Sequence, residues 1–459
     1  MKNIQRKKFY KLINETIKIF TQDEKDIYVC LNSINIINNN SKKQTDIINF
    51  LFSKLFILKS IKLFFLNILK IFAIFFLLII NCFFSHNKER QSKILFISHT
   101  FNNKIEKDNY FGNFKNVLRK NSNKYSSYFI RHNQFSLKNY KYQNINFFDL
   151  IKIFSLMISN FILWIFIPFH KRINIKIYIY CLVNIFSTSS LRNYLIVFDI
   201  IKEIKALKIN KLYYTFEGHI FERYLFEQVK KNFKNKIFIT VYQHTGLSKQ
   251  SNSIFLMNSK KYKPDKILCI NNKDVKLLKR KYSSSKILNI GRYKKKLSLK
   301  NWKILKKKKY LNKLNLLILL DDNIKEIKDF IKNPSIFKKV LVTIRCHPEK
   351  KHQLKELNLD KSIKISKNNH YISDLRKNDV LVYTHSSLLY EAIRYGLLPI
   401  KLKKYKSRLV DTFLTIKNYN EIFLIINNLN KINYEKYLEY SLNNSSYFNE
   451  KLCKKIINE

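Results

Sequence analysis

The chain has 459 residues, 46% of them hydrophobic, and a formal net charge of +55. This apolar content excludes an intrinsically disordered chain, and the length suffices for two or three domains with their own cores. The basic residues are spread along the whole chain, and no zinc-finger, RRM or KH signature is present. The charge therefore favours attraction to an anionic membrane surface over specific nucleic-acid binding. The six cysteines lie far apart without a C-x-x-C pair, which argues against a disulfide framework and is typical of a reducing compartment.

Residues 1–90 are predicted to form a helical extension, basic and apolar in turn, without a strand signal. Two apolar segments, 63–84 and 154–169, are candidates for contact with lipid. The first is long enough to cross a bilayer, which takes about 20 residues, whereas the second is short and contains Pro168. Two crossings would separate the strand-like residues 93–99 from the rest of their sheet. We therefore expect a cytoplasmic protein lying at the inner membrane surface. A single N-terminal span, and burial of both segments as core helices, are left open.

Short apolar strands alternate with amphipathic helices from residue 93 onward, which indicates βαβ units in parallel sheets. In a first domain, residues 91–291, the predicted strands are 93–98, 126–131, 211–215, 236–242, 266–270 and 286–290. In a second domain, residues 313–415, they are 314–320, 339–344, 361–365, 379–383 and 398–402. Residues 416–459 are predicted to close the chain as helices. The predicted fold is α/β, with two Rossmann-like domains facing across a cleft.

The string 345-RCHP-348 follows a predicted strand of the second domain. Arg345 offers a planar guanidinium group to phosphate oxygens, and His347 can donate from a ring nitrogen. Pro348 fixes the turn. Because open α/β sheets bind ligands at the carboxyl ends of their strands, these residues are candidates for a phosphate site.

The string 384-THSSLLYEA-392 follows a neighbouring strand and starts a helix. Thr384, Ser386 and Ser387 place hydroxyl groups beside backbone N–H groups that have no partner inside the helix, an arrangement that binds phosphate readily. Glu391 lies four residues after Ser387 and suits the hydroxyls of a ribose. Together the two strings predict a nucleotide site in the second domain.

The first domain has its own pair of strings, 213-YYTFEGHIFER-223 and 241-VYQHTGLS-248, each after a predicted strand. A carboxylate at such a strand end can take the proton of an attacking hydroxyl, so Glu217 and Glu222 are candidate general bases. Helix capping by Glu217, or an ion pair of Glu222 with a nearby basic residue, is the structural alternative.

His219 and His244 are expected beside these carboxylates, on the side of the cleft where an acceptor enters. The spacing of His219, Glu222 and His244 matches no familiar metal site, so we expect no metal there. No cofactor is expected either.

The HP string followed by the SS-x-x-x-E turn resembles bacterial polysialyltransferases and the Kdo transferases of capsule assembly. The strings YTFEGHIFER, YQHT and 109-NYFGNFKNVL-118 are similar to those of surface-carbohydrate biosynthesis proteins with a GT-B-like fold. The resemblance implies an inverting, metal-independent transfer, with His347, Ser386 and Ser387 on the donor phosphate of a CMP-sugar. It covers roughly residues 93–410.

These observations together predict a glycosyltransferase. It would move a sugar from a nucleotide-sugar donor, CMP-linked by the resemblance, to a surface polysaccharide or lipid-linked glycan such as capsule or lipopolysaccharide. The alternatives left open are a transferase of CDP-linked polyol phosphate and a non-catalytic, membrane-associated scaffold for glycan assembly.

Overall fold

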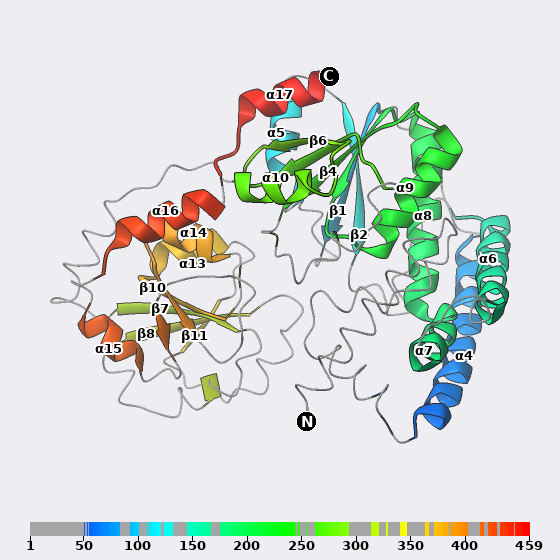
Figure 1. The fold of residues 1–459 in the computed structure, drawn as a ribbon, viewed down its shortest axis with the longest axis horizontal. Helices are drawn as coiled ribbons and strands as arrows, with labels where there is room; N and C mark the ends of the chain where they lie inside the picture. The colour runs from blue at the N-terminus through cyan, green and yellow to red at the C-terminus, as the bar shows by residue number, and fades with distance from the viewer. Residues whose placement is uncertain are drawn as a thin grey trace. The chain divides into compact units, whose positions relative to one another are not determined.

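The computed structural model describes most of the chain in separate stretches, with some single positions between them. The stretches are 55–82, 92–100, 110–120, 124–131, 145–166, 175–244, 262–292, 314–320, 340–346, 363–366, 371–384, 388–402, 414–416, 421–428, 432–444 and 446–459. The chain divides into two compact units (Figure 1). The first comprises residues 1–268, 277–288 and 453–459, and the second comprises 269–276 and 289–452.

The first unit is built on a six-stranded sheet in the order β2-β1-β3-β4-β5-β6. Its strands are β1 (Ile94–Thr100), β2 (Tyr125–Arg131), β3 (Lys211–Thr215), β4 (Phe238–Gln243), β5 (Lys266–Cys269) and β6 (Lys286–Asn289). The pairs β1–β2, β1–β3 and β3–β4 are parallel. The middle of β1 is fully buried, as expected for a central strand covered on both faces. The strand order reverses between β1 and β3, which makes this edge the topological switch point.

Three helices pack close to this sheet. They are α5 (Gly112–Lys120), α9 (Ile220–Phe233) and α8 (Thr188–Leu207). Ser187 caps α8 by accepting a hydrogen bond from the backbone N–H of Ser190, and Lys208 ends the helix in a left-handed conformation. The short α10 (Asn272–Lys279) connects β5 to β6.

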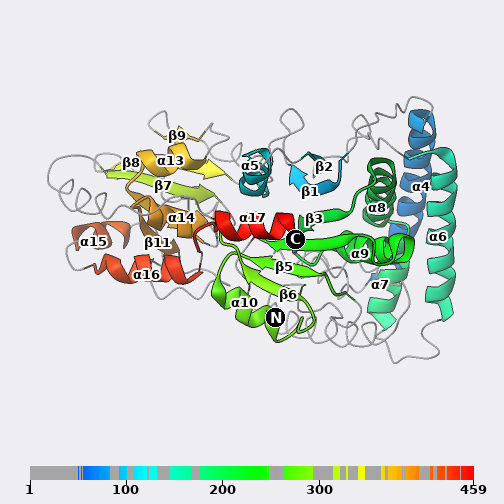
Figure 2. The ribbon, with the colours of Figure 1, turned by 90° about the horizontal axis from the view of Figure 1, so that it is seen from above.

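A helical layer lies beyond α8, formed by α4 (Phe56–Cys82), α6 (Phe147–Phe166) and α7 (Ile175–Ile185). Figure 2 shows α4 and α6 side by side, with α7 and α8 next to them. A hydrogen bond joins α4 to α7, because the buried Asn67 amide donates to the carbonyl of Val183 over 3.1 Å. Within the predicted helical extension, α4 is therefore packed on helices of the first unit, whereas residues 1–49 and 83–90 lie outside the described residues.

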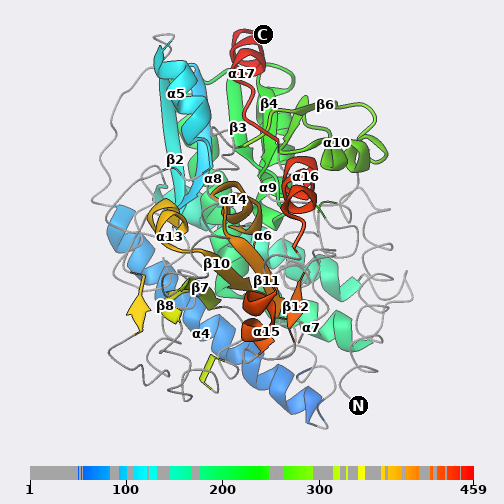
Figure 3. The same ribbon diagram turned by 90° about the vertical axis from the view of Figure 1, so that its left-hand side faces the viewer.

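The second unit has another six-stranded sheet, in the order β12-β11-β10-β7-β8-β9, with every neighbouring pair parallel (Figure 3). Its strands are β7 (Leu314–Leu320), β8 (Val340–Cys346), β9 (Lys364–Ile365), β10 (Val380–Tyr383), β11 (Leu398–Leu402) and β12 (Thr415–Ile416). Counted within the unit, this is the 3-2-1-4-5-6 order of the Rossmann fold, with its switch point between β7 and β10. The helices are α13 (Tyr371–Lys377), α14 (Leu388–Arg394), α15 (Ile422–Asn427) and α16 (Tyr434–Asn444).

The last helix, α17 (Glu450–Asn458), lies mostly in the first unit although it follows the second in sequence. Its buried side chains are Cys453, Ile456 and Ile457. The carbonyl of Ile457 accepts a hydrogen bond from Lys211 of β3 over 2.6 Å. The predicted closing segment, residues 416–459, is thus divided between the two units.

The prediction of an α/β fold with two Rossmann-like domains is confirmed by the two parallel sheets. The core-helix alternative for the two apolar segments is wrong, because only 22% of the most apolar window of α4 and 28% of that of α6 are buried. Both helices are long and apolar enough to cross a membrane by length and composition. The second apolar segment begins earlier than expected, because Asn146 and Asp149 cap α6 by reciprocal hydrogen bonds of 2.8 and 3.0 Å.

Candidate functional site

Polar side chains gather at the carboxyl ends of β1, β3 and β4, beside the switch point of the first sheet. His99 lies near the end of β1, Thr215 ends β3, Glu217 follows it, and His244 follows β4. These strands are parallel neighbours, so their ends meet at one edge of the sheet. This is the edge at which open α/β sheets bind their ligands.

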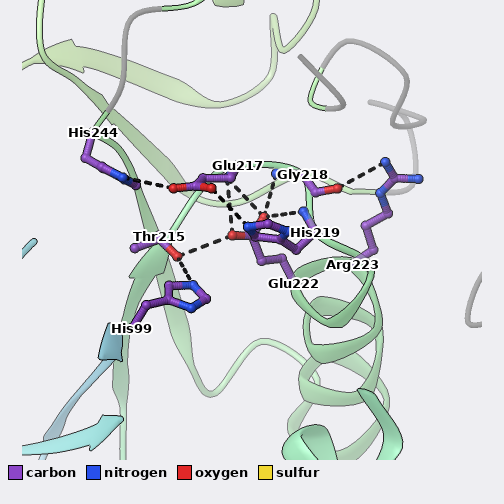
Figure 4. A network of polar contacts seen from close by, with 8 residues as sticks. All are labelled: His99, Thr215, Glu217, Gly218, His219, Glu222, Arg223 and His244. Carbon is purple, nitrogen blue, oxygen red and sulfur yellow. Dashed lines mark hydrogen bonds and ion pairs between the residues drawn. The ribbon is translucent and has the colours of Figure 1, made fainter. Parts of the chain in front are cut away.

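Glu217 is held between two histidines (Figure 4). Its Oε1 lies 2.9 Å from Nε2 of His244, and its Oε2 lies 3.0 Å from Nε2 of His219. The side chain of Glu217 is 21% exposed, that of His219 28% and that of His244 5%. The carboxylate is therefore fixed by both neighbours and still open to one side.

The two histidines hold Glu217 in its charged form. Burial alone would raise the pKa of Glu217, but the charge of His244 and the hydrogen bonds from both imidazoles lower it well below its usual value. Burial likewise opposes the charged form of His219, but the hydrogen bond and charge of Glu217 raise the pKa of His219. An ionised carboxylate in contact with hydrogen-bonding imidazoles can accept a proton and share it with them.

Glu222 shapes the loop that carries Glu217. Its carboxylate is buried and accepts hydrogen bonds from the backbone N–H groups of Glu217, Gly218 and His219, with distances between 2.6 and 3.2 Å. Gly218 adopts a positive φ of 79°, which allows the chain to turn around this carboxylate. Glu222 stands in the first turn of α9, where a carboxylate stabilises a helix. It is a positioning residue for the loop, and neither Arg223 nor Lys230 is needed to explain its burial.

His99 is part of the same network although the sequence patterns did not indicate it. Its Nε2 lies 3.1 Å from Oγ1 of Thr215, and that hydroxyl donates to Glu222 over 3.3 Å. Because the Thr215 hydroxyl donates to Glu222, His99 donates to the Thr215 oxygen. The hydrogen bond from His99 thus fixes the orientation in which the Thr215 hydroxyl contacts Glu222. The signal that could have identified it is its place near the end of the apolar strand KILFISHT, at the same sheet edge.

Asp108 and Tyr110 also reach this edge. The Asp108 carboxylate accepts from the Ser98 hydroxyl over 2.7 Å and from the backbone N–H groups of Tyr110 and Phe111 over 2.9 Å each. These bonds hold the Tyr110 ring 4.3 Å from the His244 ring and 5.9 Å from the His99 ring, between centroids. The motif thus supplies an aromatic wall beside the carboxylate.

Three groups at this edge have the chemistry of metal ligands. Ligand atoms of His99, His219 and Glu222 all lie within 4.8 Å of one another. The oxygens of Glu222 already accept hydrogen bonds from three backbone N–H groups and one hydroxyl. A metal would have to displace these donors, so the observed geometry favours the hydrogen-bonded role.

The predicted nucleotide residues of the second unit lie at the ends of β8 and β10. Arg345 is already paired, since its Nη1 lies 2.6 Å from Oδ2 of Asp374 and donates to the Ser366 hydroxyl over 3.1 Å. Thr384 is buried directly after β10, at the switch point of this sheet. The predicted residues His347, Pro348 and Ser387 lie outside the described residues.

The predicted phosphate-binding helix is α14, which has seven residues. Ser386 precedes it and accepts a hydrogen bond from the backbone N–H of Leu388 over 3.2 Å, as expected of a capping residue. Glu391, in the first turn of α14, is only 5% exposed. The expected contact between Glu391 and a ribose stays a prediction.

No known protein family matches the chain, and no curated protein sequence does. Among solved structures, UDP-GlcNAc 2-epimerase from Methanocaldococcus jannaschii is 14% identical, with a TM-score of 0.45, covering 80% of this chain and 98% of the other. The glycosyltransferase SnogD from Streptomyces nogalater is 9% identical, with a TM-score of 0.40, covering 80% and 99%. The wall teichoic acid polymerase TagF is 10% identical, with a TM-score of 0.42, covering 80% and 88%. Identities this low say nothing about the reaction. The resemblance to polysialyltransferases and Kdo transferases is supported by the short sequence motifs alone.

Proposed function

We propose that the chain is a glycosyltransferase that moves a sugar from a nucleotide-sugar donor to a surface polysaccharide or lipid-linked glycan. The observation that carries this proposal is the Glu217 carboxylate, held between His219 and His244 at the switch-point edge of a parallel sheet. A charged carboxylate fixed at a ligand-binding edge is suited to act as a general base.

In the proposed reaction Glu217 takes the proton of an acceptor hydroxyl. The freed oxygen attacks the anomeric carbon of the donor, the bond from that carbon to the phosphate oxygen breaks, and the nucleotide leaves with the bonding pair. The configuration at the carbon is inverted. His219 and His244 hold the carboxylate in place, and Tyr110 provides a flat surface for a sugar ring.

The donor phosphate is assigned to the second unit, on Thr384, Ser386 and the residues of the RCHP and THSS strings. Arg345 would contribute from its ion pair with Asp374, which orients the guanidinium group. Fixed donors of this kind stabilise the charge that develops on a departing nucleotide. The proposal that the donor carries CMP is based on the sequence motifs. The proposal that the acceptor is at an anionic inner membrane is based on the net charge of the chain and on its exposed apolar helices.

Replacing the base tests the proposal directly. The Glu217→Gln variant should lose about 100- to 10,000-fold in kcat, because the amide keeps the shape but cannot accept the proton. The measurement is transfer of radiolabelled sugar from nucleotide-sugar donors to a glycan acceptor. The same change at the exposed Glu435 of α16 is the matched control and should leave the rate unchanged.

The products and the ligands decide between this reaction and its rivals. New phosphodiester linkages in the product would show transfer of a polyol phosphate and contradict the glycosyl reaction. Normal glycan output from Glu217→Gln at normal protein level would indicate a scaffold. Thermal stabilisation across CMP, CDP, UDP and GDP identifies the nucleotide, because a ligand that binds only the native state raises the unfolding temperature. Activity that disappears with a chelator and returns with a divalent metal would contradict the metal-independent mechanism.

A further inference from the structure

The helix α4 has two apolar faces, and the described part of the chain covers only one of them. Its buried side chains Phe56, Ile71, Ile74 and Leu78 recur along one side, together with Asn67. The opposite side carries large apolar side chains that remain 58–67% exposed, namely Ile57, Leu58, Phe65, Leu69, Phe72 and Phe76. A helix on the surface of a water-soluble protein is normally polar on that side.

The helix α6 repeats this arrangement. Its buried residues, among them Ile153, Met157 and Trp164, are spaced as one helical face. Its outer side exposes Phe148 by 76% and Phe166 by 58%. Figures 1 and 2 both show α4 and α6 on the outside of the first unit, beyond α7 and α8.

Ring contacts show that α4 and α6 are antiparallel and lie at the same level. Phe64 of α4 stacks on Phe161 of α6 at 5.8 Å, whereas Phe75, further along α4, meets Phe154, earlier in α6, at 5.4 Å. The two exposed faces therefore form one continuous apolar surface, which we call the α4–α6 face.

The strand pairing rules out a crossing by α6. β1 and β2 precede α6 in the chain and β3 follows it, yet β1 pairs with both β2 and β3 in one sheet. If α6 crossed a bilayer, β1 and β3 would be on opposite sides. The next helix, α7, has 11 residues and is too short to cross back, since a span takes about 20. Because α4 lies alongside α6, it is at the same depth and does not cross either.

The charges on these helices are suited to lipid headgroups. α4 contains no acidic residue, and Lys59, Lys62 and Lys70 are exposed on it. The one acidic residue of α6, Asp149, is paired with Lys202. The exposed charge beside the α4–α6 face is thus basic, in a chain with a formal net charge of +55. Anionic lipids attract such residues, and long lysine side chains can reach headgroups while their stems stay apolar.

We propose that the α4–α6 face lies in the plane of an anionic bilayer, inserted into one leaflet without spanning it. In-plane helices of this type bury the apolar side at the boundary of headgroups and acyl chains. The inference rests on the membrane-associated part of the proposed function and not on its chemistry. It explains why the apolar surface is retained outside the fold, and it would place the first sheet next to lipid-linked acceptors.

Flotation of the purified full chain with vesicles tests this. Wild type should float with phosphatidylcholine vesicles that contain phosphatidylglycerol, and should stay bound when salt is raised, because apolar insertion is not screened. The double variant Leu69→Glu with Phe76→Glu should reduce partitioning by at least about tenfold, since two exposed apolar groups become charged. Leu424→Glu in α15 is the matched control, because Leu424 and Leu69 are both 66% exposed, and it should float like wild type.

Several outcomes would overturn the inference. Wild type that remains unbound to these vesicles, or a double variant that floats equally well, would remove the role of the α4–α6 face. A dimer in solution that the double variant dissociates, without vesicle binding, would assign the face to a second copy. Tags at the two ends of the chain that become protease-accessible on opposite sides of a native membrane would show that α4 spans. The Glu217→Gln variant should float normally, which separates failure of this inference from failure of the proposed catalysis.

Discussion

Glu217 keeps its negative charge over the pH range in which most enzymes work, because the histidines on either side lower its pKa. A group with a lowered pKa in the folded protein is ionised at neutral pH and stays ionised as the pH falls below its usual value of 4.5. If Glu217 is the base, kcat/KM should therefore stay level between about pH 7 and 5.

The position of the acid limb identifies the proton acceptor. The pKa of His219 is raised above its usual 6.5, so a reaction that needs neutral His219 would lose rate as the pH falls through a midpoint above that value. Such a midpoint in a pH profile of kcat/KM would transfer the role of base from Glu217 to His219. The His219→Gln variant serves as the control, since removal of the titrating ring should abolish that limb.

Glu222 should affect stability in the opposite direction to an ordinary surface carboxylate. Burial raises its pKa to about 7, above the usual 4.5. Between these values the folded state binds more protons than the unfolded state, so the stabilising contribution is present at low pH and is lost as the pH rises to 7. Glu222→Gln should therefore become more stable relative to wild type as the pH rises from about 4.5 to 7, measured by urea unfolding.

The same variant should also lose activity. Its amide oxygen can take the place of Oε2, but its amide nitrogen would then face the Thr215 hydroxyl and the Glu217 N–H, which donate to Oε1 in the wild type. Buried donors left without partners cost about 1–3 kcal/mol each, so the loop would rearrange. A stability difference that instead favours wild type with rising pH would show that these N–H groups keep Glu222 ionised. Glu435→Gln on the exposed face of α16 provides the reference for a carboxylate without such contacts.

The sequence pattern predicted some residues of this site but not the hydrogen bonds that connect them. Glu217, His219 and His244 were predicted because each follows an apolar strand, and the structure brings them together. His99 was not predicted as a site residue because it lies within the strand β1, where a single histidine is usually a core residue. Glu222 was predicted as a second base, but it accepts from the backbone N–H of His219 as the capping box of α9, three residues after the N-cap, and its bond from Gly218 depends on the turn of the loop.

At the scale of elements, the strands were the easiest to predict. A run such as LNLLILL is apolar on both faces, and this is typical of a central parallel strand, so β7 has the predicted bounds. The two-residue strand β12 was not predicted, because its position depends on pairing with β11 and not on its own residues. The start of α6 was missed since it depends on the cap formed by Asn146 and Asp149.

The apolar helices illustrate the limit of composition. Hydrophobicity alone could not distinguish a core helix, a membrane span and an in-plane helix. The decisive observations were the exposed fractions of individual side chains on α4 and α6 and the pairing of β1 with β3. Both depend on tertiary structure, so they could not be read from periodicity.

At the scale of the whole molecule, strand order carries the functional information. The first sheet has the order β2-β1-β3-β4 around β1, and the second has the Rossmann order. In each sheet the switch point lies beside a sequence string that was predicted to bind a substrate. Strand order depends on which crossovers pack best, and the sequence contains no direct signal for it. The position of the last helix could not be predicted from the sequence either, because α17 belongs mostly to the first unit although it follows the second unit in the chain.

This return of α17 predicts a long-range effect on stability. Ile456 and Ile457 are each 2% exposed, and their burial lies with the first unit. Ile457→Ala should lower the free energy of unfolding by about 2–4 kcal/mol, as expected for a large-to-small change in a core. The effect should be local to the first sheet, with faster hydrogen exchange in β3, whose Lys211 donates to the Ile457 carbonyl.

The second unit provides the comparison within the same molecule. Exchange in β7 and β10 should remain as slow as in wild type, because no described contact joins Ile457 to those strands. Lys451→Ala at the exposed start of the same helix should change neither sheet, since it removes no buried surface. Equal acceleration of exchange in both sheets would instead mean that the two units unfold as one cooperative block.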